Sequence, residues 1–328
     1  MKICVIGSSG HYQNACSQAS AREGVSITAA APGHKDEKPA NLSEYKSLPV
    51  PRTYSDYREM LDSEKPDAAI VNSRFDLNGK IAADILERGI NVYCEKPVAS
   101  SLEDLEILRK QIKKDGPLFC AMHELRYSPG MQSARAALRQ KDLGGLIMIT
   151  AQKSYRLNSR PEFYRNRATY SGTIPWVGSH AVDWIYWFSG KKFISGSAVH
   201  TNMYNNGHRD LEMSAHATML MEGGIPAGMN LDYARPAGAP THGDDRVRIC
   251  CERGVIEVKD ETASLINEEG IQSPLPIPKI SGIFSDFLDK LTGKSPSDLP
   301  TPEDSLYITE ICLKLRDSAD NNGEKVSF

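Results

Sequence analysis

The sequence has no long apolar run, no block of basic residues and no C-x-x-C pair of cysteines. No apolar run approaches the ~20 residues that a membrane-spanning helix needs. The 39 Lys and Arg residues are balanced by 42 Asp and Glu residues, and the net charge of −3 provides no basic surface for nucleic acid or an anionic membrane. We therefore expect neither nucleic acid nor a membrane as a partner.

The cysteines and the first ten residues indicate a protein of the reducing cytoplasm. The seven cysteines are scattered along the chain, as is typical of free thiols. The opening residues MKICVIGSSG lack the apolar region and the cleavage site of a signal peptide. No group of His, Cys, Asp and Glu has metal-ligand spacing, so we expect no metal.

The length and the composition predict two globular domains. The chain has 328 residues, of which 40% are apolar and 25% are charged. The first part alternates short apolar strands with amphipathic helices, which predicts right-handed β-α-β units and a parallel sheet over residues 1–123. The expected strands are 2–6, 25–30, 68–71, 91–94 and 118–122, and the expected helices are 10–22, 77–88 and one that begins after a capping box of Ser100 and Glu103.

The second part, residues 124–328, has the pattern of an α+β domain built on an antiparallel sheet. The expected strands are 146–155, 193–204, 213–221, 226–234, 246–250 and 254–258. Helices are expected at 179–188, 283–292 and 303–318, and the last of them is expected to pack back toward the first domain. The most irregular stretches, 235–245 and 272–279, are the expected loops over a site or at an interface.

The first turn has the position of a nucleotide-binding loop. A strand that runs into glycines and a helix N-terminus presents backbone N–H groups to a phosphate. The residues are Gly7, Ser8, Ser9, Gly10, His11 and Tyr12. Only Gly7 fits the G-x-G-x-x-G fingerprint strictly, with Gly10 displaced, so the alternative is an ordinary tight turn.

The end of the second strand bears on the choice of cofactor. An acidic residue there normally binds the ribose 2′-hydroxyl of NAD, but this sequence has no acid before Asp36. His34 and Lys35 would tolerate a 2′-phosphate better, which favours NADP. The alternative is a solvated charged turn.

Glu95, Lys96 and Pro97 directly follow the strand 91–94, where open α/β sheets bind their ligands. Pro97 leaves the preceding peptide bond the option of cis, which could aim the Lys96 side chain into the crevice. A lysine there could donate or accept a proton beside a hydride-transfer centre. The alternative is a surface turn.

A glycine-rich run leads into a second candidate at residues 171–184. If a helix begins near Ser179, His180 and Asp183 share one face, and Trp184 joins them. A carboxylate beside an imidazole fixes the tautomer and raises the pKa, as acid–base chemistry requires. The alternative is a histidine packed at a helix start.

Together these residues resemble the glucose–fructose oxidoreductase/inositol dehydrogenase family (Gfo/Idh/MocA), over nearly the whole chain. The resemblance implies an N-terminal Rossmann domain and a C-terminal domain with a large, mostly antiparallel sheet that often forms a dimer or tetramer interface. It also implies NAD or NADP as cofactor and a sugar or cyclitol hydroxyl, or the matching ketone, as the reacting group.

The resemblance implies roles residue by residue. Lys96 resembles the catalytic lysine, with Glu95 and Pro97 beside the nicotinamide. His180 matches the histidine that exchanges the hydroxyl proton, and Asp183 matches the aspartate that follows it. Ser73 and Asn78 fall where the family lines the cofactor cleft, and Glu124 and Arg126 fall where an asparagine and an arginine usually follow the sixth strand. Asn72 is a further expected cofactor contact.

The chain also departs from the family pattern. An aspartate four residues before the histidine is replaced by Trp176, whose flat face could instead stack on a sugar ring. The second fingerprint glycine is Ser9, and Arg74 replaces the usual proline.

The sequence thus predicts an NAD(P)-dependent oxidoreductase that acts on a sugar, sugar acid or cyclitol as a homo-oligomer. The alternatives are a redox-assisted glycosidase and a non-catalytic sensing paralogue. The expected substrate contacts are Arg126, Tyr155, Arg165, Trp176, His180 and His242.

Overall fold

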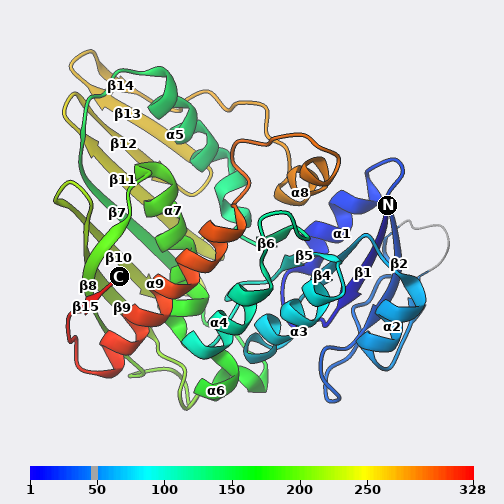
Figure 1. Ribbon diagram of the computed structural model, residues 1–328. Coiled ribbons are helices and arrows are strands. Elements are labelled where there is room, and N and C mark those ends of the chain that lie inside the picture. The colour runs from blue at the N-terminus through cyan, green and yellow to red at the C-terminus, as the bar shows by residue number, and fades with distance from the viewer. Residues whose placement is uncertain (46–50) are drawn as a thin grey trace. The chain divides into compact units, whose positions relative to one another are not determined.

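A six-stranded parallel sheet forms the centre of the first of two structural units (Figure 1). The computed structural model describes residues 1–45 and 51–328. The first unit comprises Met1–Met122, Ala168–Ser171 and Ser281–Thr309, and the second comprises His123–Arg167, Gly172–Ile280 and Glu310–Phe328. The division into domains of residues 1–123 and 124–328 stays a prediction.

The first sheet confirms the predicted doubly wound topology. Its order is β3-β2-β1-β4-β5-β6, and every adjacent pair is parallel. The apolar runs form its core, with Ile3, Val5 and Ile70 fully buried. The strands are β1 (Lys2–Ile6), β2 (Ser26–Ala31), β3 (Arg52–Thr53), β4 (Ala68–Val71), β5 (Asn91–Cys94) and β6 (Phe119–Ala121).

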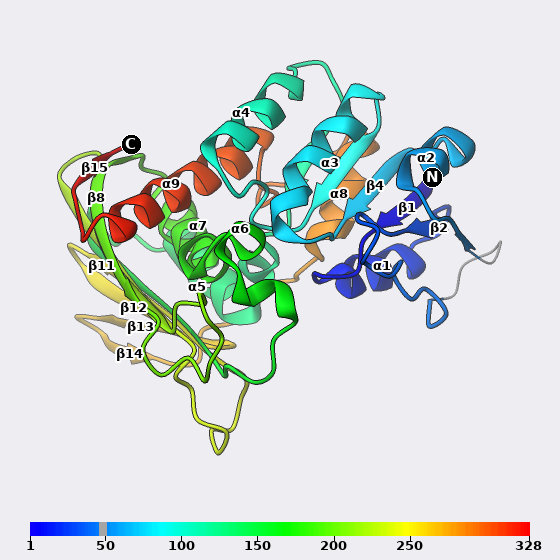
Figure 2. The same cartoon turned by 90° about the horizontal axis from the view of Figure 1, so that it is seen from below.

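Helices cover both faces of this sheet (Figure 2). One face carries α1 (Tyr12–Ser20) and α8 (Ile283–Leu291), and the other carries α2 (Tyr57–Glu64), α3 (Phe75–Glu87) and α4 (Leu102–Gln111). The capping box expected at Ser100 is wrong by one residue. Ser101 is the N-cap of α4, because its hydroxyl accepts the backbone N–H of Asp104 at 3.1 Å.

The second unit is built on a nine-stranded sheet in the order β14-β13-β12-β11-β7-β10-β9-β8-β15. All its described pairs are antiparallel except β10 with β7, so the prediction of a mostly antiparallel sheet is confirmed. The strands are β7 (Leu146–Tyr155), β8 (Phe193–Thr201), β9 (Ser214–Met221), β10 (Ile225–Asp232), β11 (Gly243–Cys251), β12 (Gly254–Lys259), β13 (Thr262–Asn267), β14 (Gly270–Gln272) and β15 (Val326–Ser327).

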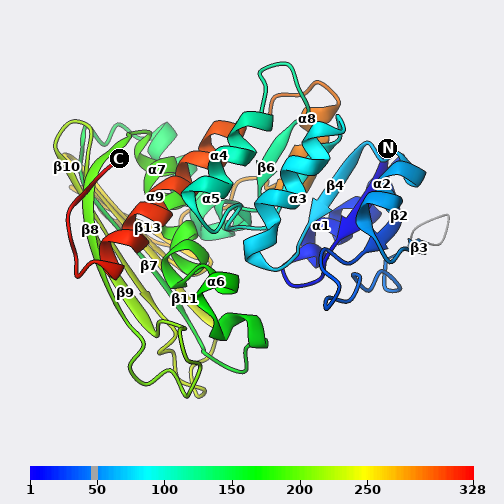
Figure 3. The ribbon, with the colours of Figure 1, turned by 60° about the horizontal axis from the view of Figure 1, so that its bottom comes forward.

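Helices α5 (Pro129–Gln140) and α7 (Ser179–Ser189) pack on one face of this sheet (Figure 3). The sequence did not predict α5, because its buried face consists mainly of small and polar residues such as Gly130, Ser133 and Ala134. A Cβ atom at Gly130 would lie 2.6 Å from the backbone oxygen of Asp260, so this close packing requires glycine.

The remaining α-helices, α6 (Arg167–Tyr170) and α9 (Pro302–Asp320), are each divided between the two units. The division falls after Arg167 in α6 and after Thr309 in α9.

The loop expected at 235–245 is shorter than predicted, because strand β11 already begins at Gly243. Within the described residues, no helix is both long and apolar enough to cross a membrane.

Candidate functional site

The glycine turn after β1 lies directly against the end of β4. Gly7 has a φ of +78°, and a Cβ atom there would lie 2.6 Å from Cα of Ser73, so only glycine fits without strain. The backbone N–H of Ser9 donates to the carbonyl oxygen of Asn72 at 2.8 Å and fixes the turn. Gly10 is equally confined, since its Cβ atom would meet the Glu95 carboxylate at 2.5 Å.

The N–H groups of this turn bind carboxylate oxygens of the same chain. Glu37 accepts from the backbone N–H of Ser8 at 3.1 Å. Glu95 accepts from the backbone N–H of His11 at 2.7 Å and contacts its ring Nδ1 at 2.8 Å. Burial raises the pKa of Glu95, but His11 and the charge of Lys96 outweigh it and leave that pKa lowered.

Asn78 joins the ends of β4 and β5. Its side-chain oxygen accepts the backbone N–H of Ser73 at 3.0 Å, and its amide donates to the carbonyl oxygen of Glu95 at 3.3 Å. Asn72, which precedes Ser73, is fully buried, and neither polar atom of its side chain has a hydrogen-bond partner in the described part of the chain. Buried side-chain amides are normally hydrogen-bonded, so a polar ligand could supply the hydrogen bonds that Asn72 lacks.

These features fit a nicotinamide dinucleotide. The turn excludes every side chain at Gly7 and Gly10, its N–H groups already hold anionic oxygens, and Asn72 offers a donor and an acceptor. The residues that would hold the dinucleotide are those of the turn together with Asn72 and Ser73.

Lys96 follows β5, as predicted, and is only 2% exposed. The tripeptide is therefore not the surface turn that was the alternative. The Lys96–Pro97 peptide bond is cis, and the backbone N–H of Lys96 donates to Oε1 of Glu95 at 2.9 Å.

The remaining predicted cofactor residues lie in different surroundings. Tyr12 is buried in α1, and its hydroxyl oxygen accepts the backbone N–H of Asn41 at 3.3 Å. The ring of His34 accepts the N–H of Asp36 at 3.3 Å, whereas Lys35 is exposed. Glu124 begins a 3-10 turn of the second unit, and its cofactor contact stays a prediction.

In the second unit, His180 lies in the first turn of α7, which begins at Ser179 as predicted. A π-helical turn at Ile174–Gly178 leads into it. The His180 ring stacks on Trp184 with centroids 6.1 Å apart, and it meets the edge of His123 at 6.5 Å. His180 is 5% exposed, so solvent reaches only a small part of it.

Asp183 has a different partner from the expected one. Its carboxylate accepts two hydrogen bonds from Nε of Arg126, at 2.8 and 2.9 Å, and lies 2.6 Å from a terminal nitrogen of the same guanidinium. Both side chains are almost fully buried. The pair anchors α7 to the 3-10 turn at Glu124–Tyr127. The roles of Arg126 in substrate binding and of Asp183 in orienting His180 stay predictions.

The other predicted substrate residues are aromatic or cationic and lie in the same unit. Trp176 is 5% exposed and meets Tyr164 edge-on at 6.1 Å. Tyr155 lies between His242 at 5.4 Å and Tyr233 at 6.2 Å. Arg165 forms a weaker ion pair with Glu162 at 3.4 Å.

Sequence reasoning missed several polar residues near these positions. Lys153 of β7 is buried and forms an ion pair with Asp245, which lies opposite it in β11. Burial lowers the pKa of Lys153 and raises that of Asp245. The pair could have been found only from the strand register. Also missed were Arg156 and Arg160 of the second unit and, in the first unit, Glu37.

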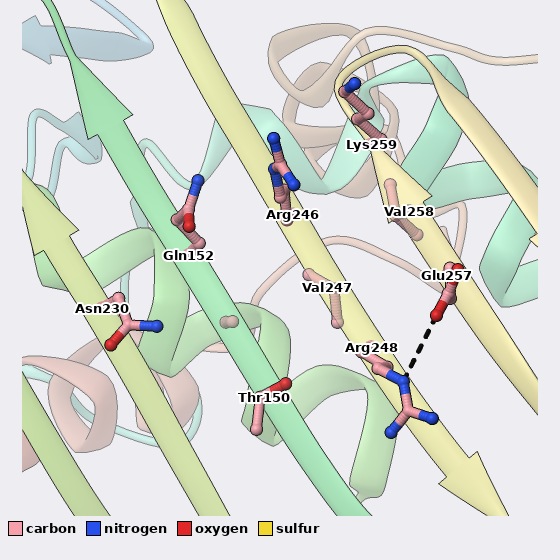
Figure 4. Close-up of a pocket in the computed structure, with 10 residues that line it drawn as sticks. Thr150, Gln152, Asn230, Arg246, Val247, Arg248, Glu257, Val258 and Lys259 are labelled. Carbon is pink, nitrogen blue, oxygen red and sulfur yellow. Dashed lines mark hydrogen bonds and ion pairs between the residues drawn. The ribbon is translucent and has the colours of Figure 1, made fainter. Parts of the chain in front are cut away.

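A separate pocket lies on the sheet, on strands β7, β10, β11 and β12 (Figure 4). Polar side chains line it, and Arg248 pairs there with Glu257 at 3.3 Å. None of the predicted site residues lines this pocket. Its lining residues are Thr150, Ala151, Gln152, Asn230, Arg246, Val247, Arg248, Glu257, Val258 and Lys259. Within residues 1–45 and 51–328, no group of three His, Cys, Asp or Glu side chains could hold a metal.

Comparison with known proteins gives two adjoining family matches. Residues 1–123 match an oxidoreductase family with an NAD-binding Rossmann fold, GFO_IDH_MocA, and residues 131–257 match the GFO/IDH/MocA C-terminal domain. An oxidoreductase structure from Thermotoga maritima is 43% identical, with a TM-score of 0.93 and full coverage of both chains.

Named relatives are more distant. Trans-1,2-dihydrobenzene-1,2-diol dehydrogenase of Xenopus tropicalis is 21% identical over 73% of this chain and 70% of its own length. D-xylose 1-dehydrogenase (NADP(+)) 2 of Haloferax volcanii is 26% identical, but the match covers only 47% of either chain. Aldose–aldose oxidoreductase of Caulobacter crescentus shares the fold, with a TM-score of 0.81 at 18% identity, covering 100% of this chain and 99% of that one.

Proposed function

The chain belongs to the Gfo/Idh/MocA oxidoreductase family, and we propose on this premise that it oxidises a hydroxyl, or reduces the matching ketone, of a sugar, sugar acid or cyclitol. The observation that carries the proposal is the buried Lys96, which follows β5 and is bonded through its backbone to Glu95. In the same unit lies a glycine turn whose N–H groups bind anionic oxygens.

When bound, NAD or NADP supplies the hydride acceptor or donor. Lys96 holds or moves the proton of the reacting hydroxyl at its Nζ atom, as a general acid or base in a buried position. In the second unit, His180 is the other proposed acid–base group, and the Arg126–Asp183 pair positions α7, which carries His180. Trp176 offers an apolar face to a sugar ring.

The test is the turnover of nicotinamide with a panel of polyols, aldoses and sugar acids, followed by absorbance. Lys96→Ala is expected to lower kcat/KM by about 10²–10⁴-fold, which is the usual contribution of a general acid–base group. Lys110→Ala, on the exposed part of α4, is the matched control. Equal rates for Lys96→Ala and the native chain on an established substrate would remove the proposed role.

Two further expectations belong to this proposal. We propose a cytoplasmic homo-oligomer that associates through the large sheet, where the polar pocket of Figure 4 lies. Light scattering of the purified chain tests this, and a monomer at micromolar concentration would contradict it. No specific contact favours the redox-assisted glycosidase or the sensing paralogue, so neither is proposed.

A further inference from the structure

The carboxylate of Glu37 lies at the end of β2, beside Gly33. In the dinucleotide fingerprint the acid at this place directly follows the strand, whereas Glu37 comes six residues after it. Its Oε1 atom accepts from the backbone N–H of Ser8 at 3.1 Å and from the hydroxyl of Ser9 at 2.5 Å. Its Oε2 atom accepts from the backbone N–H of Gly33 at 3.1 Å and from the hydroxyl of Ser73 at 2.8 Å. The carboxylate therefore joins the glycine turn, β2 and β4.

Two cationic or ionisable side chains near this carboxylate, those of Arg74 and His34, are engaged with other partners. Arg74, the residue after Ser73, binds Asp76 through two hydrogen bonds of 2.6 and 3.0 Å. Paired in this fork geometry, its guanidinium is less available to a phosphate. The ring of His34 is turned to the backbone of Asp36.

We propose that Glu37 makes the dinucleotide site selective for NAD over NADP. The two serine hydroxyls are the exchangeable donors on the carboxylate, and a ribose diol offers two O–H groups of the same kind. A 2′-phosphate offers no proton and brings negative charge against the carboxylate. This inference rests on the nucleotide binding proposed above, and it replaces the expectation of NADP that came from His34 and Lys35.

The test is a fluorescence titration of the full chain with NADH and with NADPH. We expect NADPH to bind at least about tenfold more weakly, and Glu37→Gln to reduce this ratio by about tenfold, because a neutral amide repels phosphate less. Asp36→Asn is the control, since its side chain is 76% exposed, and the ratio is expected to stay unchanged.

Each outcome bears on the inference. Equal affinities in the native chain, or an unchanged ratio in Glu37→Gln, would overturn it. If Glu37→Gln fails to fold, as thermal unfolding would reveal, the native ratio still decides. Binding of neither dinucleotide would instead contradict the proposed function.

A second observation, in the other unit, carries an independent inference about the substrate. Arg156 and Arg160 follow β7, and no carboxylate among the described residues lies within ion-pair distance of either. Arg156 donates to the carbonyl oxygen of Ala239, and Arg160 donates to that of Arg156 at 3.1 Å. The Nε atoms of both are buried without a hydrogen-bond partner.

These guanidinium groups adjoin an aromatic cluster. Arg160 lies 4.9 Å from the ring centre of Tyr233 and 5.6 Å from that of Tyr164. His242 contacts Tyr155, and its pKa is lowered by burial and then by the charges of Arg160, Lys153 and Arg156. Lys153 is neutralised by Asp245, so two uncompensated cations remain.

The cluster connects to His180 through packed side chains. His180 stacks on Trp184, the Nζ atom of Lys153 lies 5.7 Å from the centre of the Trp184 ring, and the same atom lies 4.2 Å from the centre of the Tyr155 ring.

We infer that Arg156 and Arg160 bind a carboxylate of the substrate. The substrate is then a sugar acid rather than a neutral sugar or cyclitol. This inference also rests on the proposed function.

The test is calorimetric binding of D-gluconate and D-glucuronate, compared with myo-inositol, to the chain loaded with dinucleotide. We expect the acids to bind at least about tenfold more tightly, and Arg160→Gln and Arg156→Gln each to abolish most of this difference. Arg248→Gln, on β11 in the pocket of Figure 4, is the control that keeps it.

Tighter binding of myo-inositol, or a difference unaffected by both arginine variants, would overturn the inference. Dinucleotide binding without binding of any polyol or acid would contradict the proposed substrate class. If neither variant folds, the native comparison of acid with cyclitol still decides.

Discussion

The two units treat charge in opposite ways. In the first, carboxylates of the chain itself satisfy the donors of the glycine turn, through Glu37 and Glu95. In the second, the buried carboxylate of Asp183 pairs with Arg126 and the partly buried carboxylate of Asp245 pairs with Lys153, whereas Arg156 and Arg160 have no carboxylate partner among the described residues. The two inferences follow from this difference: a carboxylate of the first unit is proposed to select the dinucleotide, and two guanidinium groups of the second are proposed to bind a substrate carboxylate.

The largest expected effect concerns the buried pair of the second unit. Arg126→Leu leaves the Asp183 carboxylate buried without its cation, which costs about 3–5 kcal/mol of unfolding free energy. Chemical denaturation of the full chain measures this loss. Arg139→Leu, on the exposed end of α5, is the control, and a similar loss there would show that the pair is not responsible.

The second effect concerns the glycine turn of the first unit. Gly7→Ala places a methyl group against Ser73 at a positive φ, which costs about 1–3 kcal/mol and displaces the turn. We expect NADH affinity to fall with it. Gly24→Ala is the matched control, because it also has a positive φ but nothing lies within 4 Å of its Cβ position. Equal NADH affinity in the two variants would contradict the close approach of the turn to β4.

A smaller effect distinguishes two neighbouring serines. Ser101→Ala removes the N-cap hydrogen bond of α4 and is expected to cost about 1 kcal/mol. Ser100→Ala is expected to cost less, because Ser100 is not the N-cap and its contact with Asp104 is longer, at 3.5 Å. Thermal unfolding of both variants decides which serine is the cap.

The smallest effect is a difference in acid response between the units. Folding lowers the pKa of Glu95, so the ionised Glu95 carboxylate stabilises the folded protein at every pH above the pKa of an unfolded Glu. This stabilisation is lost as the pH falls through the folded-state pKa. The raised pKa of Asp245, caused by burial, acts in the opposite sense: its contribution is present at low pH and is lost as pH rises.

Melting temperatures measured from neutral to acid pH test this difference. Glu95→Gln is expected to flatten the acid-side loss of stability, whereas Asp245→Asn is expected to steepen it. Parallel curves for the two variants would contradict the assigned directions.

The predictability of the structure from sequence differs between the units for a physical reason. Apolar strands such as Lys2–Ile6 and Asn91–Cys94 have a local pattern, so they and the position of Lys96 were predictable. Helix α5 was not, because small residues form its buried face. The partner of Asp183 was also hidden, since Arg126 is distant in sequence and the periodicity of one helix points only to His180.

Glu37 shows the same limit within the first unit. The dinucleotide fingerprint places an acid at the end of β2, but here the loop that follows β2 folds back and brings Glu37 to Gly33. Backbone reversal of this kind depends on contacts with Ser8 and Ser73, which no local pattern encodes.

The central claim is that the first unit binds a nicotinamide dinucleotide through the glycine turn and Ser73. Titration of the native chain with NADH, followed by quenching or enhancement of the nicotinamide fluorescence, tests it most directly. The account predicts saturable binding at one site per chain that Gly7→Ala weakens and Gly24→Ala does not. Absence of saturable binding in the folded native chain would contradict it.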